Sequence, residues 1–138
     1  MKRLGRLSNS CLREIERVSK YEYLKKGKGK VNRRVKGLRE KISYYDCLML
    51  DITHSIEFAD VQTESVASKI KSFNKINDVM NSRRKMKDLL SFYAIVQLLY
   101  KEGLNRRNYN KYLKRVRNFV NRCENRIYKS RVEGNESA

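Results

Sequence analysis

The hydrophobic positions of the chain recur with helical spacing over most of its length. The clearest pattern alternates intervals of four and three residues through Val31, Val35, Leu38, Ile42, Tyr45, Met49, Ile52, Ile56 and Ala59. A heptad repeat sustained over about four repeats is typical of a helix with a coiled-coil-like packing face. We therefore predict a long helix over residues 31–60.

Similar spacing and suitable capping residues predict three further helices. Ser8, Asn9 and Ser10 can cap a helix over 11–26, which ends in the basic, glycine-containing stretch that follows. Thr63 can begin a helix over 63–102, ended by Gly103, and Asn105 can cap a last helix over 106–131. The tail, residues 133–138, is expected to fray.

The two long helices are predicted to form an antiparallel hairpin, because the turn between them is short. With the tip near Val61, the apolar residues of the two helices face each other in these pairs: Ile56 with Val66, Ile52 with Ile70, Met49 with Phe73, and Ile42 with Met80. The expected fold is all-α and a single domain over 1–138. It is a coiled-coil-like hairpin braced by the N- and C-terminal helices. Because a narrow seam often needs more partners, a homodimer is also possible.

The predicted apolar stripe of the third helix is interrupted by the segment Ser82–Asp88, which contains Arg83 and Arg84. The structural interpretation is that the aliphatic stems pack while a guanidinium pairs with Glu40 or Asp88. The functional interpretation is bidentate contact with phosphate. The two are compatible, since one of two adjacent arginines can face inward and the other outward. The predicted register also places Arg33 and Arg34 close to this segment.

The chain is strongly basic, with 33 Lys and Arg against 15 acids and a formal charge of +18. Residues 1–40 and 81–138 each contribute +10, whereas residues 41–80 contribute −2. This excess is beyond the charge of roughly 2–8 that keeps a small domain soluble. A basic surface at the end of the hairpin far from the tip would attract nucleic acid, ribosomes or an anionic membrane.

The last helix is predicted to be amphipathic, with Leu113, Val116, Val120, Cys123 and Ile127 on one face. Basic residues lie on the opposite face, which could rest on phosphates, an acidic protein or an anionic membrane. Three tyrosines, Tyr109, Tyr112 and Tyr128, flank this helix and could stack on bases or anchor at an interface. The alternative is an ordinary solvated surface opposite a core-facing stripe.

Catalytic chemistry has little support in the sequence. The only histidine, His54, and Glu57 could share a metal or a proton, but two ligands are poor grounds for a zinc site. The three cysteines are far apart, and no nucleotide-binding or hydrolase motif is present. We expect a non-enzymatic protein without a metal or cofactor. With neither an apolar signal segment nor a membrane-spanning run, a cytoplasmic location is expected.

Three short motifs carry a resemblance to a known group of proteins. They are His54-Ser55-Ile56-Glu57-Phe58, Arg83-Arg84-Lys85-Met86-Lys87-Asp88, and Asn125-Arg126-Ile127-Tyr128-Lys129-Ser130-Arg131-Val132. Over about residues 40–132 the chain resembles small helical proteins of Gram-positive phages and prophages. Ser130 replaces a proline of that pattern, and Ser65-Val66 replaces a glycine pair. The resemblance implies a phage origin, an accessory role in the host cytoplasm and no catalytic residues.

Three functions are compatible with these features. The first is nucleic-acid binding through phosphate contacts. The second is a protein-binding modulator or inhibitor of a host nucleic-acid-handling or defence complex, which would use its cationic face on an acidic host protein surface. The third is a structural virion or packaging component. The candidate nucleic-acid-binding residues are Arg33, Arg34, Arg83, Arg84, Lys85, Lys87, Lys111, Arg115, Arg122, Arg126 and Lys129.

Overall fold

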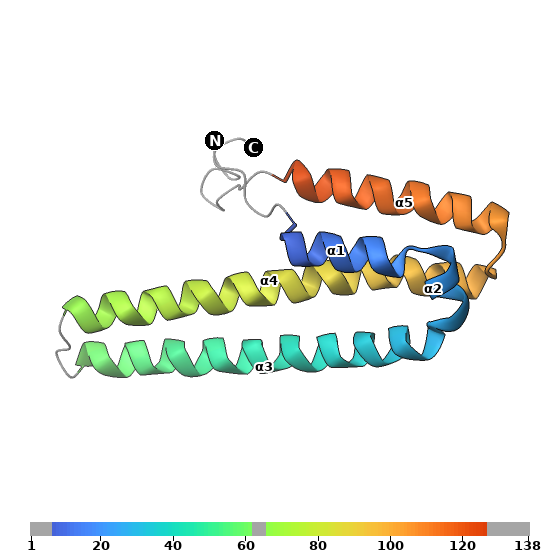
Figure 1. Ribbon diagram of the computed structural model, residues 1–138. Coiled ribbons are helices and arrows are strands. Elements are labelled where there is room, and N and C mark those ends of the chain that lie inside the picture. The colour runs from blue at the N-terminus through green and yellow to red at the C-terminus, as the bar shows by residue number, and fades with distance from the viewer. Residues whose placement is uncertain (1–6, 62–65, 127–138) are drawn as a thin grey trace, which may run out of the picture. The chain divides into compact units, whose positions relative to one another are not determined.

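The computed structural model describes residues 7–61 and 66–126, and of residues 58–61 only the backbone. This part of the chain forms five helices: α1 (Asn9–Val18), α2 (Tyr21–Lys26), α3 (Lys28–Val61), α4 (Val66–Glu102) and α5 (Arg106–Glu124) (Figure 1). Helices α3 and α4 pack side by side and antiparallel, and α1 and α5 pack against α4. The all-α architecture with a long antiparallel hairpin is therefore confirmed.

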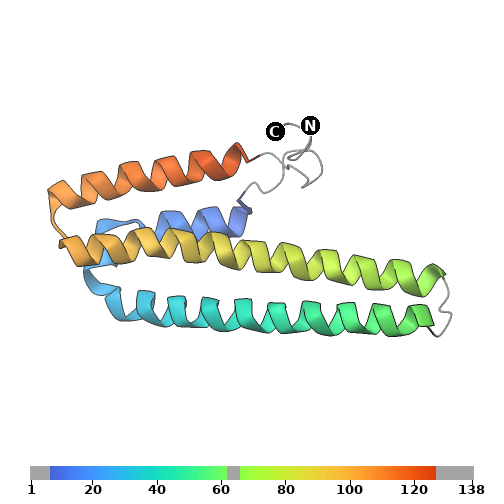
Figure 2. The same cartoon turned by 180° about the vertical axis from the view of Figure 1, so that it is seen from behind.

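The helices group into two compact units, which we describe separately. Unit 1 comprises Met1–Lys25 and Ile95–Ala138, so it contains α1, most of α2, the last two turns of α4, and α5. Unit 2 is Lys26–Ala94, the hairpin of α3 and the longer part of α4 (Figure 2). No helix in the described parts of the chain has a stretch long and apolar enough to cross a membrane.

Helix ends depart from the prediction at three places. The helix predicted over 11–26 is two helices, because α1 ends at Val18 with Ser19 as its C-cap and α2 begins at Tyr21. The predicted break at 27–30 shrinks to Gly27, whose carbonyl already accepts the Val31 N–H at 2.8 Å, so α3 begins at Lys28. The last helix ends at Glu124 with Asn125 as its C-cap. Residues 127–138, and the predicted start of α4 at Thr63, lie outside the described residues.

The predicted caps are confirmed where the structure describes them. The Ser8 side chain accepts a hydrogen bond from the Cys11 N–H at 3.2 Å at the start of α1. At the end of α4, Gly103 has a φ of +103°, in the left-handed region that glycine adopts without strain. The Asn105 side chain accepts the Asn108 N–H at 2.8 Å and begins α5.

The predicted register of the hairpin is wrong. Arg83 of α4 donates to the carboxylate of Asp46 on α3, so these two residues lie at the same level. The predicted pairs, such as Ile42 with Met80, would instead place Arg83 level with Arg39, which lies about seven residues or two turns before Asp46 along α3. Helix α3 continues to Val61, which moves the turn past the position assumed for it.

The face of α4 that packs on α3 also differs from the predicted one. Its members follow heptad spacing and are buried or half-buried: Ser72, Ile76, Val79, Arg83, Met86 and Leu90. Four of the five residues of the predicted stripe are exposed, with 43–74% of each side chain accessible in Val66, Ile70, Phe73 and Met80. The fifth, Ile76, is half-buried and belongs to the observed face. Fully buried side chains concentrate away from the tip, where Val31, Leu38 and Phe92 are almost inaccessible. Nearer the tip, only Ile52 and Val79 are buried among the described residues.

Candidate nucleic-acid interface

Helix α5 is held in unit 1 by tyrosine hydroxyls. Tyr109 donates to the Ser19 carbonyl at 2.7 Å, and the hydroxyls of Tyr112 and Ser19 lie 2.8 Å apart. Ser19 is the C-cap of α1, so both bonds fasten α5 to the end of that helix. In the same unit, Tyr100 of α4 donates to the Leu24 carbonyl of α2 at 2.7 Å. The two Ser19 contacts fix which face of α5 points outward.

The aromatic residues proposed to stack on bases are structural in the part that is described. Tyr112 is fully buried, and the Tyr109 ring packs edge-on against Tyr21 with centroids 5.1 Å apart. The buried face of α5 consists of Tyr112, Val116, Phe119 and Cys123. Around the helix axis this face is rotated from the predicted one by about 50°, half of the rotation between successive residues. Leu113 and Val120 are only half-buried. Tyr128 lies outside the described residues.

Removal of the Tyr112 hydroxyl tests this attachment. Burial raises the pKa of Tyr112 above its ordinary value of about 10, while the hydrogen bond with Ser19 acts in the opposite direction. The folded state therefore holds this proton more tightly than the unfolded state. The resulting stability is fully present below about pH 10 and is lost as the pH rises above it.

We expect Tyr112→Phe to lower the free energy of unfolding by about 1 kcal/mol at neutral pH, because one hydrogen bond is lost. Between about pH 9 and 12 its melting temperature should fall less steeply than that of the wild type. Thermal melts followed by circular dichroism measure both effects. Tyr44→Phe, at an exposed position, is the control for ionisation in general. If the melting temperatures of the wild type and Tyr112→Phe fell in parallel with rising pH, the role given to the buried Tyr112 hydroxyl would be contradicted.

The outward surface of α5 is strongly basic. The helix contains seven Lys and Arg residues and one acid, Glu124. Lys111, Lys114, Arg117 and Arg122 are exposed. Lys114 and Arg117 were not among the predicted site residues, although the correct phase of the buried face would have identified them. Together they make α5 the most basic helix of unit 1.

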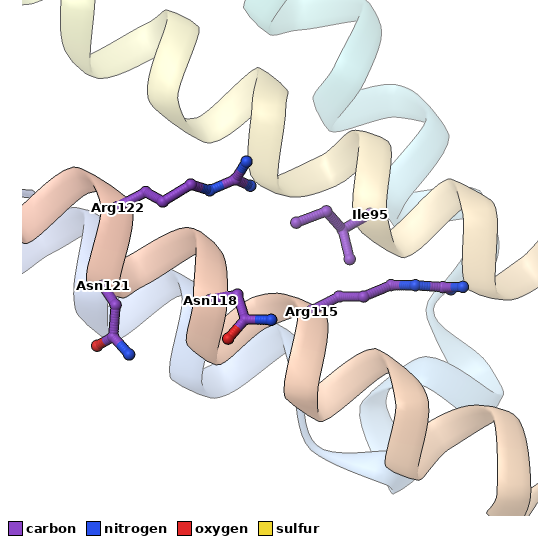
Figure 3. Close-up of a pocket in the computed structure, with 5 residues that line it drawn as sticks. All are labelled: Ile95, Arg115, Asn118, Asn121 and Arg122. Atoms are coloured by element: carbon purple, nitrogen blue, oxygen red, sulfur yellow. The ribbon is translucent and has the colours of Figure 1, made fainter.

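A pocket of about 660 Å³ opens beside this surface, lined by Ile95 of α4 and by Arg115, Asn118, Asn121 and Arg122 of α5. Figure 3 shows the two arginines extending toward α4 on either side of Ile95. Arg115 is already engaged, since its Nη1 lies 2.9 Å from Oε1 of Glu102. Arg122 has no such partner in the described parts of the chain. Its guanidinium, with the amide of Asn118, is available to an anion.

The remaining predicted residues of unit 1 differ in availability. Lys111 is exposed, as predicted. Arg126 is half-buried, and its Nε lies 3.4 Å from the Cys123 carbonyl of the preceding turn. Lys129 lies outside the described residues. The structure therefore brings Arg115 and Arg122 together, with Lys111 one turn before Arg115.

In unit 2 the predicted residues separate into two places. Arg33 and Arg34 lie at least twelve residues before Asp46, which is about 18 Å along α3. They are thus not close to Arg83, which lies level with Asp46. The reason is the corrected register. Arg33 is exposed and Arg34 is half-buried.

Arg83 forms an ion pair, as the structural interpretation expected, but its partner is neither Glu40 nor Asp88. Arg83 faces α3 and pairs with Asp46. Arg84 is half-buried, and Lys85 and Lys87 are exposed. Lys85 and Lys87 are therefore the accessible cations of this segment.

The first part of α3 is as basic as α5. Residues 28–41 include seven Lys and Arg and one acid, Glu40. Lys30, Arg33, Lys36, Arg39 and Lys41 are exposed. Of the seven basic residues in 28–41, only Arg33 and Arg34 were predicted as site residues. Each unit thus has its own basic surface.

Among the described residues, no three of His, Cys, Asp and Glu lie close enough together to hold a metal ion. His54 and Glu57 are both exposed on α3. Comparison with protein-family models, with curated proteins and with solved structures finds no match for the chain.

Proposed function

We propose that the protein is a non-enzymatic nucleic-acid-binding protein that contacts phosphates through two basic surfaces. One is the outward surface of α5 in unit 1. The other is the first part of α3 in unit 2. The observation that supports this most is segregation of charge: residues 28–41 and α5 each have seven cations and one acid, whereas residues 42–61 have no Lys or Arg.

The described surface of α5 favours a double-stranded ligand. Proteins that bind single strands commonly stack bases on exposed aromatic rings. The aromatic residues of α5 are buried or half-buried, so they offer no such platform. Arginine and lysine side chains along a helix instead suit the regularly spaced phosphates of a duplex. Binding would then depend weakly on sequence and steeply on salt.

A titration of labelled duplex DNA, duplex RNA and single-stranded DNA across a series of salt concentrations tests the proposal. We expect a duplex to bind more tightly than the single strand. The logarithm of the association constant should fall linearly with the logarithm of salt concentration, by about 0.9 per phosphate contacted. Failure of every polyanion to bind, even at low salt, would contradict the proposal.

A protein-binding modulator is the second candidate, because the same cations and amides also fit carboxylates. Arg122 and Asn118 beside Ile95 combine charge with an apolar floor, as protein interfaces do. In that case the chain would form a stoichiometric complex with one acidic protein. Polyanion binding would be weak at physiological salt.

A further inference from the structure

One face of α4 exposes a row of apolar side chains in unit 2. Val66, Ile70, Phe73 and Met80 follow one another at intervals of four, three and seven residues, with Asn77 at the intermediate heptad position. This is a second heptad seam, distinct from the one that α3 covers. Contiguous exposed apolar surface of this kind marks an interaction site.

An edge of α3 has matching spacing and opposite charge. Asp46, Leu50, Thr53 and Glu57 lie at intervals of four, three and four, and Leu50 is 57% exposed. The edge is acidic, because α3 contains no Lys or Arg beyond Lys41. In contrast, the first part of α4 has three lysines, Lys69, Lys71 and Lys75, before its first acid at Asp78.

We propose that the exposed seam of α4 packs against this edge of α3 in a second copy of the chain. Two copies of unit 2 then form a four-helix bundle about a two-fold axis parallel to the helices. Charge favours this arrangement. Packing of α4 against α4 of the second copy would bring lysines together, whereas packing of α4 against α3 of the second copy brings lysines beside carboxylates. The inference does not depend on nucleic-acid binding.

The register supports this pairing. The Arg83–Asp46 ion pair fixes which residues of the two helices lie at the same level, and an axis parallel to the helices keeps those levels in the partner. To within one residue, about 1.5 Å along the helix, Met80 then faces Leu50 of the second copy, Asn77 faces Thr53, and Arg84 faces Asp46. Each contact joins residues of the same or complementary character, and Phe73 lies level with Glu57, whose aliphatic stem it can cover.

Oligomeric state in solution tests the inference. Sedimentation equilibrium should give twice the chain mass of 16.5 kDa for the wild type. Ile70→Glu with Phe73→Glu should give a monomer with unchanged helical circular dichroism, because both side chains are already exposed in the single chain. The control Tyr44→Glu, at an exposed aromatic outside the proposed contact, should remain a dimer. A monomeric wild type, or a dimer that survives the double substitution, would overturn the inference.

Disulfide trapping tests the pairing of helices without relying on a disruptive variant. In a Cys47→Ser background, one preparation has Leu50→Cys and the other Met80→Cys, while Cys11 and Cys123 are buried. After mixing and mild oxidation, we expect a covalent dimer that contains one chain of each kind. Neither preparation alone should cross-link to the same extent. Preferential cross-linking within the Met80→Cys preparation would show α4 on α4 and overturn the proposed arrangement.

Discussion

Phe92→Ala is expected to lower the free energy of unfolding by about 3–5 kcal/mol. The Phe92 ring is completely inaccessible and packs against the Tyr93 ring with centroids 5.1 Å apart. Truncation removes its buried apolar surface and leaves a cavity. Because a domain of this size is stable by only about 5–15 kcal/mol, the variant should lose a large part of its stability. Urea denaturation followed by circular dichroism at a fixed protein concentration measures this.

Tyr44→Ala is the matched control, since it also truncates an aromatic ring in a helix of unit 2. Tyr44 is 63% exposed, so its removal should cost less than about 1 kcal/mol. Neither Phe92 nor Tyr44 belongs to the proposed contact between copies, so dimer formation does not enter the comparison. Similar losses for the two variants would mean that the end of unit 2 away from the tip is not its principal core.

The parts of the fold that were predicted correctly depend on local signals in the sequence. The heptad of α3 is unbroken from Val31 to Ile56, so its phase and helical state follow from spacing alone. Caps at Ser8, Gly103 and Asn105 depend on local backbone chemistry, which residue type determines. Local signals of this kind were sufficient to predict the number of long helices and their antiparallel pairing.

The register was not predictable from apolar content, because α4 has two seams of heptad spacing. The more apolar one contains Ile70, Phe73 and Met80, yet its phase continues into Arg84 and Lys87. The other contains Ser72 and Arg83, and its phase continues into Met86, Leu90 and Tyr93. Packing at the well-buried end selects the second phase for the whole helix. The interruption at Arg83–Arg84 marks the point where the two seams become distinguishable.

Side-chain hydrogen bonds between distant segments were not predicted. Ser19, the C-cap of α1, accepts a hydrogen bond from Tyr109 through its carbonyl and shares one with Tyr112 through its hydroxyl. Ser19 and Tyr112 are 93 residues apart, so neighbouring sequence gives no signal for their pairing. As a result, residues predicted to stack on bases instead hold α5 in place. The accessible site consists of cations, two amides and Ile95 rather than exposed rings.

Dimer formation through unit 2 would strengthen the proposed phosphate binding. Two copies double the number of basic surfaces, and binding of the second surface to the same duplex becomes intramolecular. The Ile70→Glu, Phe73→Glu variant should then bind polyanions more weakly, although it retains Lys111, Arg122 and Arg33. This loss should be smaller on duplexes too short to reach both copies. Self-association and phosphate binding can therefore be separated experimentally.

Reversal of three cations on α5 should reduce affinity for a duplex on the order of 10²–10³-fold at low salt, because three phosphate contacts are lost. The variant is Lys111→Glu, Lys114→Glu and Arg122→Glu, all at exposed positions outside the buried face. The salt slope should become shallower by about 2.7, at 0.9 per contact. A second variant with Lys30→Glu, Arg33→Glu and Lys36→Glu should give a loss of similar size through unit 2.

The same change in net charge on α1 and at Lys20, just before α2, distinguishes a binding surface from a general electrostatic attraction. Arg13, Arg17 and Lys20 are exposed in unit 1, near Glu14 and Glu16 and outside both basic surfaces. At about 0.15 M salt, charges farther apart than about 8 Å are largely screened, so their reversal to Glu should lower affinity only about threefold and leave the salt slope unchanged. Arg83 is unsuitable for such a test, since Glu beside Asp46 would disrupt the hairpin itself. If the α1 variant lost as much affinity as the α5 variant, net charge alone would explain binding, and α5 would not be a binding surface.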